Sequence, residues 1–124
     1  MTGVEVYDIE ILLVDDHQPI SDLFCELLTD AGYQVMQAKD ALAAIGILSI
    51  LPCRLIISDY SMPGMTGVTF LQQMRIQYPK IRTILSSADP CLPFLAAQAG
   101  ADGFYRKGKP LTDLLALIQN ILHT

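Results

Sequence analysis

Five short apolar runs alternate along the chain with longer stretches in which apolar residues recur at helical spacing. The runs are Ile9–Val14, 33–38, 55–58, 81–86 and 104–106. The first and third runs lack the polar alternation of a half-exposed strand, which is typical of central strands that are buried on both faces. Apolar residues at every third or fourth position instead indicate a helix with one buried side. Strict alternation of the two patterns predicts an α/β fold, a parallel sheet with helices on both faces.

Three of the intervening stretches have an apolar stripe along one helical face. The first stripe spans 20–31 and ends before Gly32, which we expect to be its C-terminal cap. The second spans 68–78 and ends before Pro79, and the third spans Leu111–Leu122. These stretches are the predicted first, third and fifth helices.

The other two predicted helices are less regular. Pro90 and Pro93 cannot both lie inside one regular helix, so the fourth helix should be short and begin near Pro93. The second helix, 40–51, has little polar face, because its apolar residues are Leu42, Ile45, Ile47, Leu48, Ile50 and Leu51. Either several of these side chains are singly exposed, or they form a surface for a partner or for self-association.

The length of 124 residues corresponds to one domain, with 1–8 as an N-terminal extension and no effector domain after the fifth helix. The net charge of -5 and only 8 Lys and Arg residues argue against direct nucleic-acid binding. Three cysteines, with no close pair, suggest neither a disulfide framework nor a zinc site and fit a reducing, cytoplasmic location. The most apolar segment, 41–51, is too short to span a membrane.

Polar residues interrupt the apolar pattern where the predicted strands end. In an open parallel sheet these carboxyl ends form the ligand crevice, so residues that are distant in sequence meet there. The residues at these ends are Asp15, Asp16, Asp59, Ser86, Ser87 and Lys107. Each alone has an ordinary explanation, as a helix cap, a turn residue or a solvated lysine. Their joint placement is what predicts a site.

Three clustered carboxylates repel one another unless a cation joins them. Oxygen ligands without sulfur favour Mg²⁺ over zinc, and Mn²⁺ is the alternative ion with the same preference. One carboxylate could then attack phosphorus, as in known aspartyl phosphates. Lys107 could pair with the phosphate, and Ser87 could donate a hydrogen bond to it.

Segments 12–17, 55–67 and 99–104 resemble the response regulator receiver domains of two-component signalling, chemotaxis receivers among them. The most specific segment places an acceptor aspartate, Asp59, before Met-Pro-Gly-Met-Thr-Gly. The resemblance covers nearly the whole chain. It implies a flavodoxin-like, doubly wound, five-stranded parallel sheet in the order 2-1-3-4-5.

The resemblance also implies roles for single residues. Asp59 would be the phosphoacceptor and also one of the metal ligands. Asp15 and Asp16 would be the acidic pair that holds Mg²⁺, with Asp16 the more direct ligand. Ser61 would supply its backbone carbonyl to the metal. Ser87 would be the switch hydroxyl, and Phe104 the switch aromatic residue.

The conserved lysine of the family has two candidates in this chain. Lys109 precedes Pro110 and so matches the Lys-Pro dipeptide of the family. Lys107 matches the ungapped register, four residues after Gly103, and lies on the opposite strand face from Phe104. We choose Lys107, with Lys109 as the alternative. Gly108 then stands where the family has its proline. Whether the peptide bond after the lysine is cis, as is usual in the family, is therefore left open.

The function implied is a phosphorylation switch that receives phosphate from a histidine kinase or a histidine phosphotransfer protein. Phosphorylation would change the surface around the fourth strand, fourth helix and fifth strand and so control a downstream protein or a fused effector domain. A homodimer is a further expectation. Beyond self-phosphorylation and autodephosphorylation with Mg²⁺, no enzyme activity is expected.

Three other classes are alternatives. A Mg²⁺-dependent phosphohydrolase normally has a second acid two residues after its nucleophile, where this chain has Ser61. A flavodoxin-like electron carrier would need a phosphate-binding loop in place of Asp15 and Asp16. A degenerate receiver that only binds partners would lack some of the active-site residue types, all of which are present.

Overall fold

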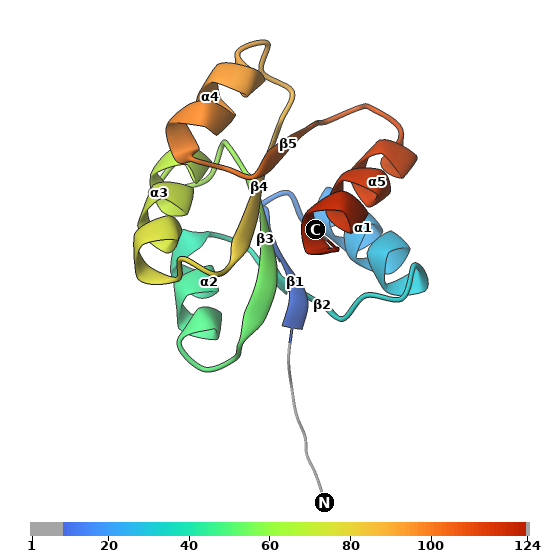
Figure 1. Cartoon of the computed structure of the whole chain (residues 1–124), viewed down its shortest axis with the longest axis horizontal. Coiled ribbons are helices and arrows are strands. Elements are labelled where there is room, and N and C mark those ends of the chain that lie inside the picture. Colours follow the sequence, from blue (N-terminus) through green and yellow to red (C-terminus); the bar gives the residue numbers. More distant parts are fainter. Residues whose placement is uncertain (1–8, 124) are drawn as a thin grey trace, which may run out of the picture.

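Five parallel strands form the centre of the computed structural model, which describes residues 9–123 (Figure 1). Their spatial order is β2-β1-β3-β4-β5, which confirms the predicted flavodoxin-like α/β fold. The strands are β1 Ile9–Val14, β2 Val35–Ala38, β3 Cys53–Asp59, β4 Arg82–Ser87 and β5 Gly103–Arg106. The predicted N-terminal extension, 1–8, lies outside the described residues.

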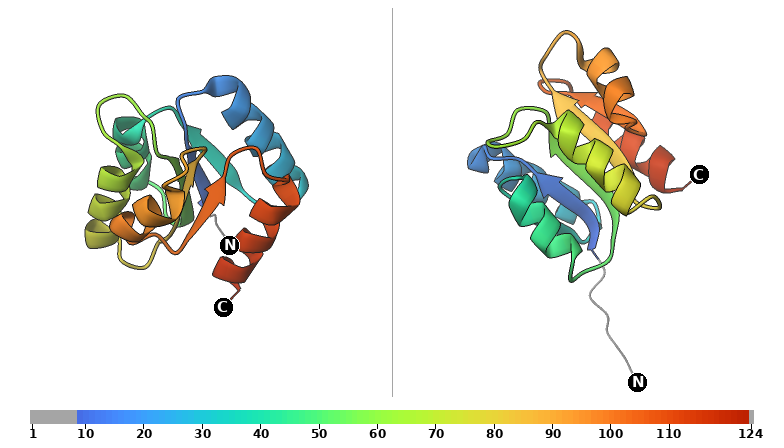
Figure 2. Two further views of the ribbon diagram at one scale, coloured as in Figure 1. Left: turned by 90° about the horizontal axis from the view of Figure 1, so that it is seen from above. Right: turned by 90° about the vertical axis from the view of Figure 1, so that its left-hand side faces the viewer.

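Helices cover both faces of the sheet, and each face has its own apolar core. The helices are α1 Gln18–Asp30, α2 Ala41–Leu48, α3 Gly67–Gln77, α4 Leu92–Ala99 and α5 Leu111–Leu122. One core, which includes Phe70, packs α2, α3 and α4 against the sheet, and the other, which includes Leu114, packs α1 and α5 against the opposite face (Figures 1 and 2). No helix in the described range is both long and apolar enough to cross a membrane.

The second helix ends earlier than its apolar composition predicts. It begins as expected after Asp40, whose carboxylate accepts a hydrogen bond from the backbone of Ala43 at 2.8 Å. It ends at Leu48 rather than at residue 51, because Pro52 disfavours helical geometry in the residue before it and β3 starts immediately afterwards. Leu42 and Ile50 are each 79% exposed, which is compatible with both interpretations of this apolar stretch.

The fourth helix is short, as its two prolines predict. It has eight residues, and Pro93 lies in its first turn, where proline needs no hydrogen-bond partner for its nitrogen. Pro90 precedes the helix. Gly100 terminates it with a φ of 67°, in the left-handed region that favours glycine.

Candidate functional site

Three carboxylates gather at the carboxyl edge of the sheet. Asp15 and Asp16 directly follow β1, and Asp59 is the last residue of the neighbouring strand β3. One carboxylate oxygen from each of the three lies within 4.8 Å of the others. Asp59 is buried, Asp15 is half-buried and Asp16 is exposed, so the cluster opens to solvent on the side of Asp16.

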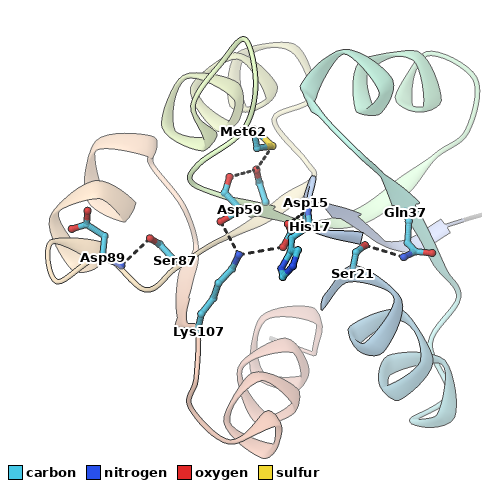
Figure 3. Close-up of polar contacts among 10 residues, drawn as sticks. Asp15, His17, Ser21, Gln37, Asp59, Met62, Ser87, Asp89 and Lys107 are labelled. Carbon is cyan, nitrogen blue, oxygen red and sulfur yellow. Dashed lines mark hydrogen bonds and ion pairs between the residues drawn. The ribbon is translucent and has the colours of Figure 1, made fainter. Parts of the chain in front are cut away.

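Lys107 reaches this cluster from the end of β5, two strands away from Asp59 (Figure 3). Its ammonium nitrogen lies 3.0 Å from Oδ1 of Asp59 and 3.3 Å from Oδ2 of Asp15. Lys109 is exposed, and its backbone carbonyl accepts a hydrogen bond from the hydroxyl of Tyr105. The structure therefore brings Lys107, rather than Lys109, to the carboxylates.

The two members of the closest ion pair both have raised pKa values. Burial raises the pKa of Asp59 above its ordinary value, and the hydrogen bond and charge of Lys107 offset only part of this effect. Burial by itself would lower the pKa of Lys107, but the hydrogen bonds and charges of Asp59 and Asp15 outweigh it and raise the pKa. Lys107 is therefore a stable positive charge at neutral pH.

Backbone hydrogen bonds hold the carboxylates in place. Oδ1 of Asp15 accepts from the backbone nitrogen of His17 at 2.8 Å, and His17 directly precedes α1 as its N-cap. The backbone N–H of Ser61 hydrogen-bonds Asp59 and acts to lower its pKa. The use of the Ser61 carbonyl as a metal ligand stays a prediction.

The donor set fits a hard divalent cation. All three clustered ligands are carboxylates, which Mg²⁺ and Mn²⁺ prefer, and the cluster contains no thiolate or imidazole that would favour zinc. Three carboxylates against the single charge of Lys107 leave the site negative when all are ionised. A bound cation would offset that charge and leave the site able to accept an anionic phosphoryl group.

The predicted switch residues, Ser87 and Phe104, lie on the adjacent strands β4 and β5. The hydroxyl of Ser87 is buried and accepts a hydrogen bond from the backbone nitrogen of Asp89 at 3.0 Å (Figure 3). Phe104 lies on β5 and is 44% exposed. Both belong to the β4–α4–β5 side of the molecule.

Two residues of this region were not predicted from the sequence. The backbone carbonyl of Asp89 accepts a hydrogen bond from the guanidinium of Arg106 at 2.8 Å, and its carboxylate accepts one from the backbone of Cys91 at 2.7 Å. Asp89 thus ties the loop before α4 to β5. The dipeptide Asp89-Pro90 is a turn signal that could have identified the aspartate, but no local pattern indicates the contact with Arg106.

Comparisons with known proteins identify the family of this chain. The sequence profile of the family described as the response regulator receiver domain matches residues 11–119. The probable chemotaxis protein CheY of Rhizobium etli is 33% identical over 118 residues, which cover 91% of this chain and 92% of that protein. The putative two-component response regulator ARR21 of Arabidopsis thaliana is 30% identical over 92% of this chain, but the match spans only 19% of its length.

A solved structure shows the same architecture. The response regulator protein TrrA of Thermotoga maritima, in complex with Mg(2+)-BeF, superposes with a TM-score of 0.84 at 27% identity. The superposition covers 92% of this chain and 99% of that protein.

Proposed function

Since the chain belongs to the response regulator receiver domain family of two-component signalling, we propose that it is a switch whose Asp59 accepts a phosphoryl group. The donor is a histidine kinase or a histidine phosphotransfer protein. The observation that carries the proposal is the meeting of Asp15, Asp16 and Asp59 with the ammonium group of Lys107 at the carboxyl edge of the sheet.

In the proposed transfer, a carboxylate oxygen of Asp59 forms a bond to phosphorus while the bond from phosphorus to the donor nitrogen breaks. The electron pair of the broken bond stays on the leaving imidazole. Lys107 keeps its charge beside the reacting carboxylate and can pair with the phosphoryl oxygens as they arrive. Asp15, Asp16, Asp59 and the carbonyl of Ser61 would hold Mg²⁺, which when bound would offset the negative charge of the phosphoryl group.

The response to phosphorylation would begin at Ser87. Turning its hydroxyl toward the phosphoryl group would withdraw the acceptor that now binds the backbone of Asp89. Arg106 holds the carbonyl of the same residue, so the loop before α4 and the strand β5 would adjust together. Phe104 could then move toward the space that Ser87 leaves. The changed β4–α4–β5 surface would control a downstream protein or a fused effector domain.

The central claim can be tested by incubating the protein with Mg²⁺ and acetyl phosphate and measuring its intact mass. We expect a gain of one phosphoryl group that requires the divalent cation and is lost in Asp59→Asn. The substitution is nearly isosteric, and its circular dichroism spectrum should match the wild type. Labelling that survives Asp59→Asn would contradict the assignment.

A further inference from the structure

The hydroxyl of Ser86 is buried in the interior without a hydrogen-bond partner among the described residues. Ser86 is only 4% exposed, and within residues 9–123 its Oγ is the buried side-chain polar atom for which no hydrogen-bond partner is found. A buried hydroxyl without a partner is destabilising, because it has lost its bonds to water and gained none in return. Such a group in a folded protein calls for an explanation, and a functional role is one of the few available.

The strand register places Ser86 beside the phosphoacceptor. Asp59 on β3 pairs with Ser86 on β4, which in turn pairs with Tyr105 on β5. Paired residues of adjacent parallel strands lie on the same face of the sheet. Ile57 and Ile84, two residues before Asp59 and Ser86, belong to the same apolar core, so both side chains lie on the face covered by α1 and α5.

The side chain of Lys107 reaches Asp59 from the far side of β4. Lys107 follows Tyr105 by two residues and is anchored at the end of β5, where its backbone nitrogen donates to the carbonyl of Ser87 at 3.0 Å. To reach Asp59 on β3 its side chain must pass over β4, and Ser86 is the residue of β4 in register with Asp59. The ammonium group then binds Oδ1 of Asp59 at 3.0 Å. In this state Lys107 donates to that oxygen, and no hydrogen-bond partner is found among residues 9–123 for the hydroxyl of Ser86.

We propose that Ser86 is a positioning residue whose hydroxyl forms a hydrogen bond with Asp59 only when Asp59 is phosphorylated. The inference rests on the proposed function of Asp59. When Asp59 carries a phosphoryl group, Lys107 moves from the carboxylate to the phosphoryl oxygens, which bear more charge. The remaining carbonyl oxygen of Asp59 then accepts a hydrogen bond from Ser86, and the unfavourable state of that hydroxyl is relieved only after phosphorylation.

Neighbouring serines show why Ser86 differs. Ser58, equally buried on β3, donates to the backbone carbonyl of Asp59 at 2.9 Å, and Ser87 accepts from Asp89 at 3.0 Å. Removing the Ser58 hydroxyl therefore breaks an existing bond, whereas removing that of Ser86 breaks none. Ser58→Ala is the matched control for Ser86→Ala, since both delete one oxygen from a buried strand residue.

The test combines urea unfolding with titration by beryllofluoride in the presence of Mg²⁺, using wild type, Ser86→Ala, Ser86→Thr and Ser58→Ala. Without beryllofluoride, we expect Ser86→Ala to shift the unfolding midpoint upward and Ser58→Ala to shift it downward. With beryllofluoride, Ser86→Ala should bind about tenfold more weakly than wild type, because a hydrogen bond is missing from the loaded state alone. Ser86→Thr, which keeps the hydroxyl, should bind within about twofold of wild type.

The outcomes separate this inference from the proposed function. If wild type binds beryllofluoride and Ser86→Ala binds it equally well, the role of Ser86 is wrong and that of Asp59 stands. A downward shift of the Ser86→Ala midpoint without beryllofluoride would also overturn the inference, since the hydroxyl would then already have a partner. If wild type does not bind beryllofluoride at all, the proposed function fails first.

Discussion

Asp59 lies where a carboxylate is neither freely solvated nor fully neutralised. Burial raises its pKa, Lys107 acts to lower it, and the charge of Asp15 raises it again. Because Asp15 lies beside the ion pair of Asp59 and Lys107, the site keeps a net negative charge that a bound cation can offset. Removal of the lysine should therefore weaken the binding of an anionic group at the site.

We expect Lys107→Met to weaken beryllofluoride binding by about tenfold or more, because a charge-assisted hydrogen bond contributes about 1.5–3 kcal/mol. Lys109→Met is the matched control, with the same change in side chain two residues away, and its affinity should stay within about twofold of wild type. Isothermal titration calorimetry in excess Mg²⁺ measures both. The reverse order of effects would assign the site lysine to Lys109.

A second residue-scale prediction concerns the cysteines. Burial raises the pKa of the Cys53 thiol to about 11, and its sulfur lies 3.2 Å from the carbonyl of Leu55. Cys91 is exposed.

Because the thiolate is the reactive form, iodoacetamide at pH 8 should label Cys91 at least tenfold faster than Cys53. Labelling of Cys53 should accelerate about tenfold per pH unit as the pH rises toward 11, and peptide mass spectrometry follows each site separately. Equal rates at pH 8 would show that Cys53 is not protected.

At the scale of single elements, the junction between β3 and α3 is the tightest point near the site. Gly67 is the first residue of α3, and its backbone nitrogen donates to the carbonyl of Tyr60 at 2.7 Å. A Cβ atom added at Gly67 would lie 2.2 Å from the backbone oxygen of Asp59, which is closer than real contacts allow. The helix thus rests directly on the strand end that carries Asp59.

Gly67→Ala should therefore lower the free energy of unfolding by about 1–3 kcal/mol through overpacking. Gly46→Ala makes the same change in the exposed interior of α2, where an added Cβ meets nothing within 4 Å. That control should raise the free energy of unfolding by up to about 1 kcal/mol, because alanine favours the helix. Urea unfolding followed by circular dichroism measures both. Destabilisation by both variants to the same degree would show that close packing at Asp59 is not the cause.

The loop from β5 to α5 shows how one residue changes an element. Gly108 has a φ of 96°, and within residues 9–123 no peptide bond is cis. Proline holds φ near -65°, so a Lys-Pro dipeptide could not adopt this backbone at Gly108. The chain turns through glycine at this point, and Pro110 directly precedes α5 two residues later.

At the scale of the whole molecule, hydrogen bonds at Asp89 join Ser87 of β4 to Arg106 of β5, whereas α1 and α5 pack on the face of the sheet opposite to α4. A signal that begins at Asp59 should therefore spread unevenly. The loop at Asp89 is the point at which the site and that side meet.

We expect beryllofluoride with Mg²⁺ to speed hydrogen exchange at the backbone of Asp89 by about tenfold or more, because its acceptor on Ser87 is withdrawn. Ser87→Ala lacks that acceptor from the start, so the exchange there should be fast in both states. The amides of α1 should change little. Hydrogen-exchange mass spectrometry with overlapping peptides resolves the difference. A uniform change over all helices would contradict a response confined to one side.

Much of the fold was determined by local sequence patterns. The run Ile9–Val14 and the stripe Leu111–Leu122 have the bounds of β1 and α5, because buried strands and amphipathic helices leave a periodicity that needs no knowledge of distant residues. The short fourth helix followed from its prolines. The motif around Asp59 was enough to indicate the family. The predicted end of α2 was wrong. The apolar composition continues past Leu48, but the helix ends there and the chain leads into β3.

Only the tertiary structure decided the contacts that depend on strand register and on side chains that extend from one strand to another. Both Lys107 and Lys109 follow β5, and the structure alone shows that the ammonium of Lys107 crosses β4 to Asp59. The partnerless hydroxyl of Ser86 and the bond from Arg106 to Asp89 leave no local pattern either. Periodicity records which face of an element is buried. The partner that a side chain meets there is set by strands that are distant in sequence.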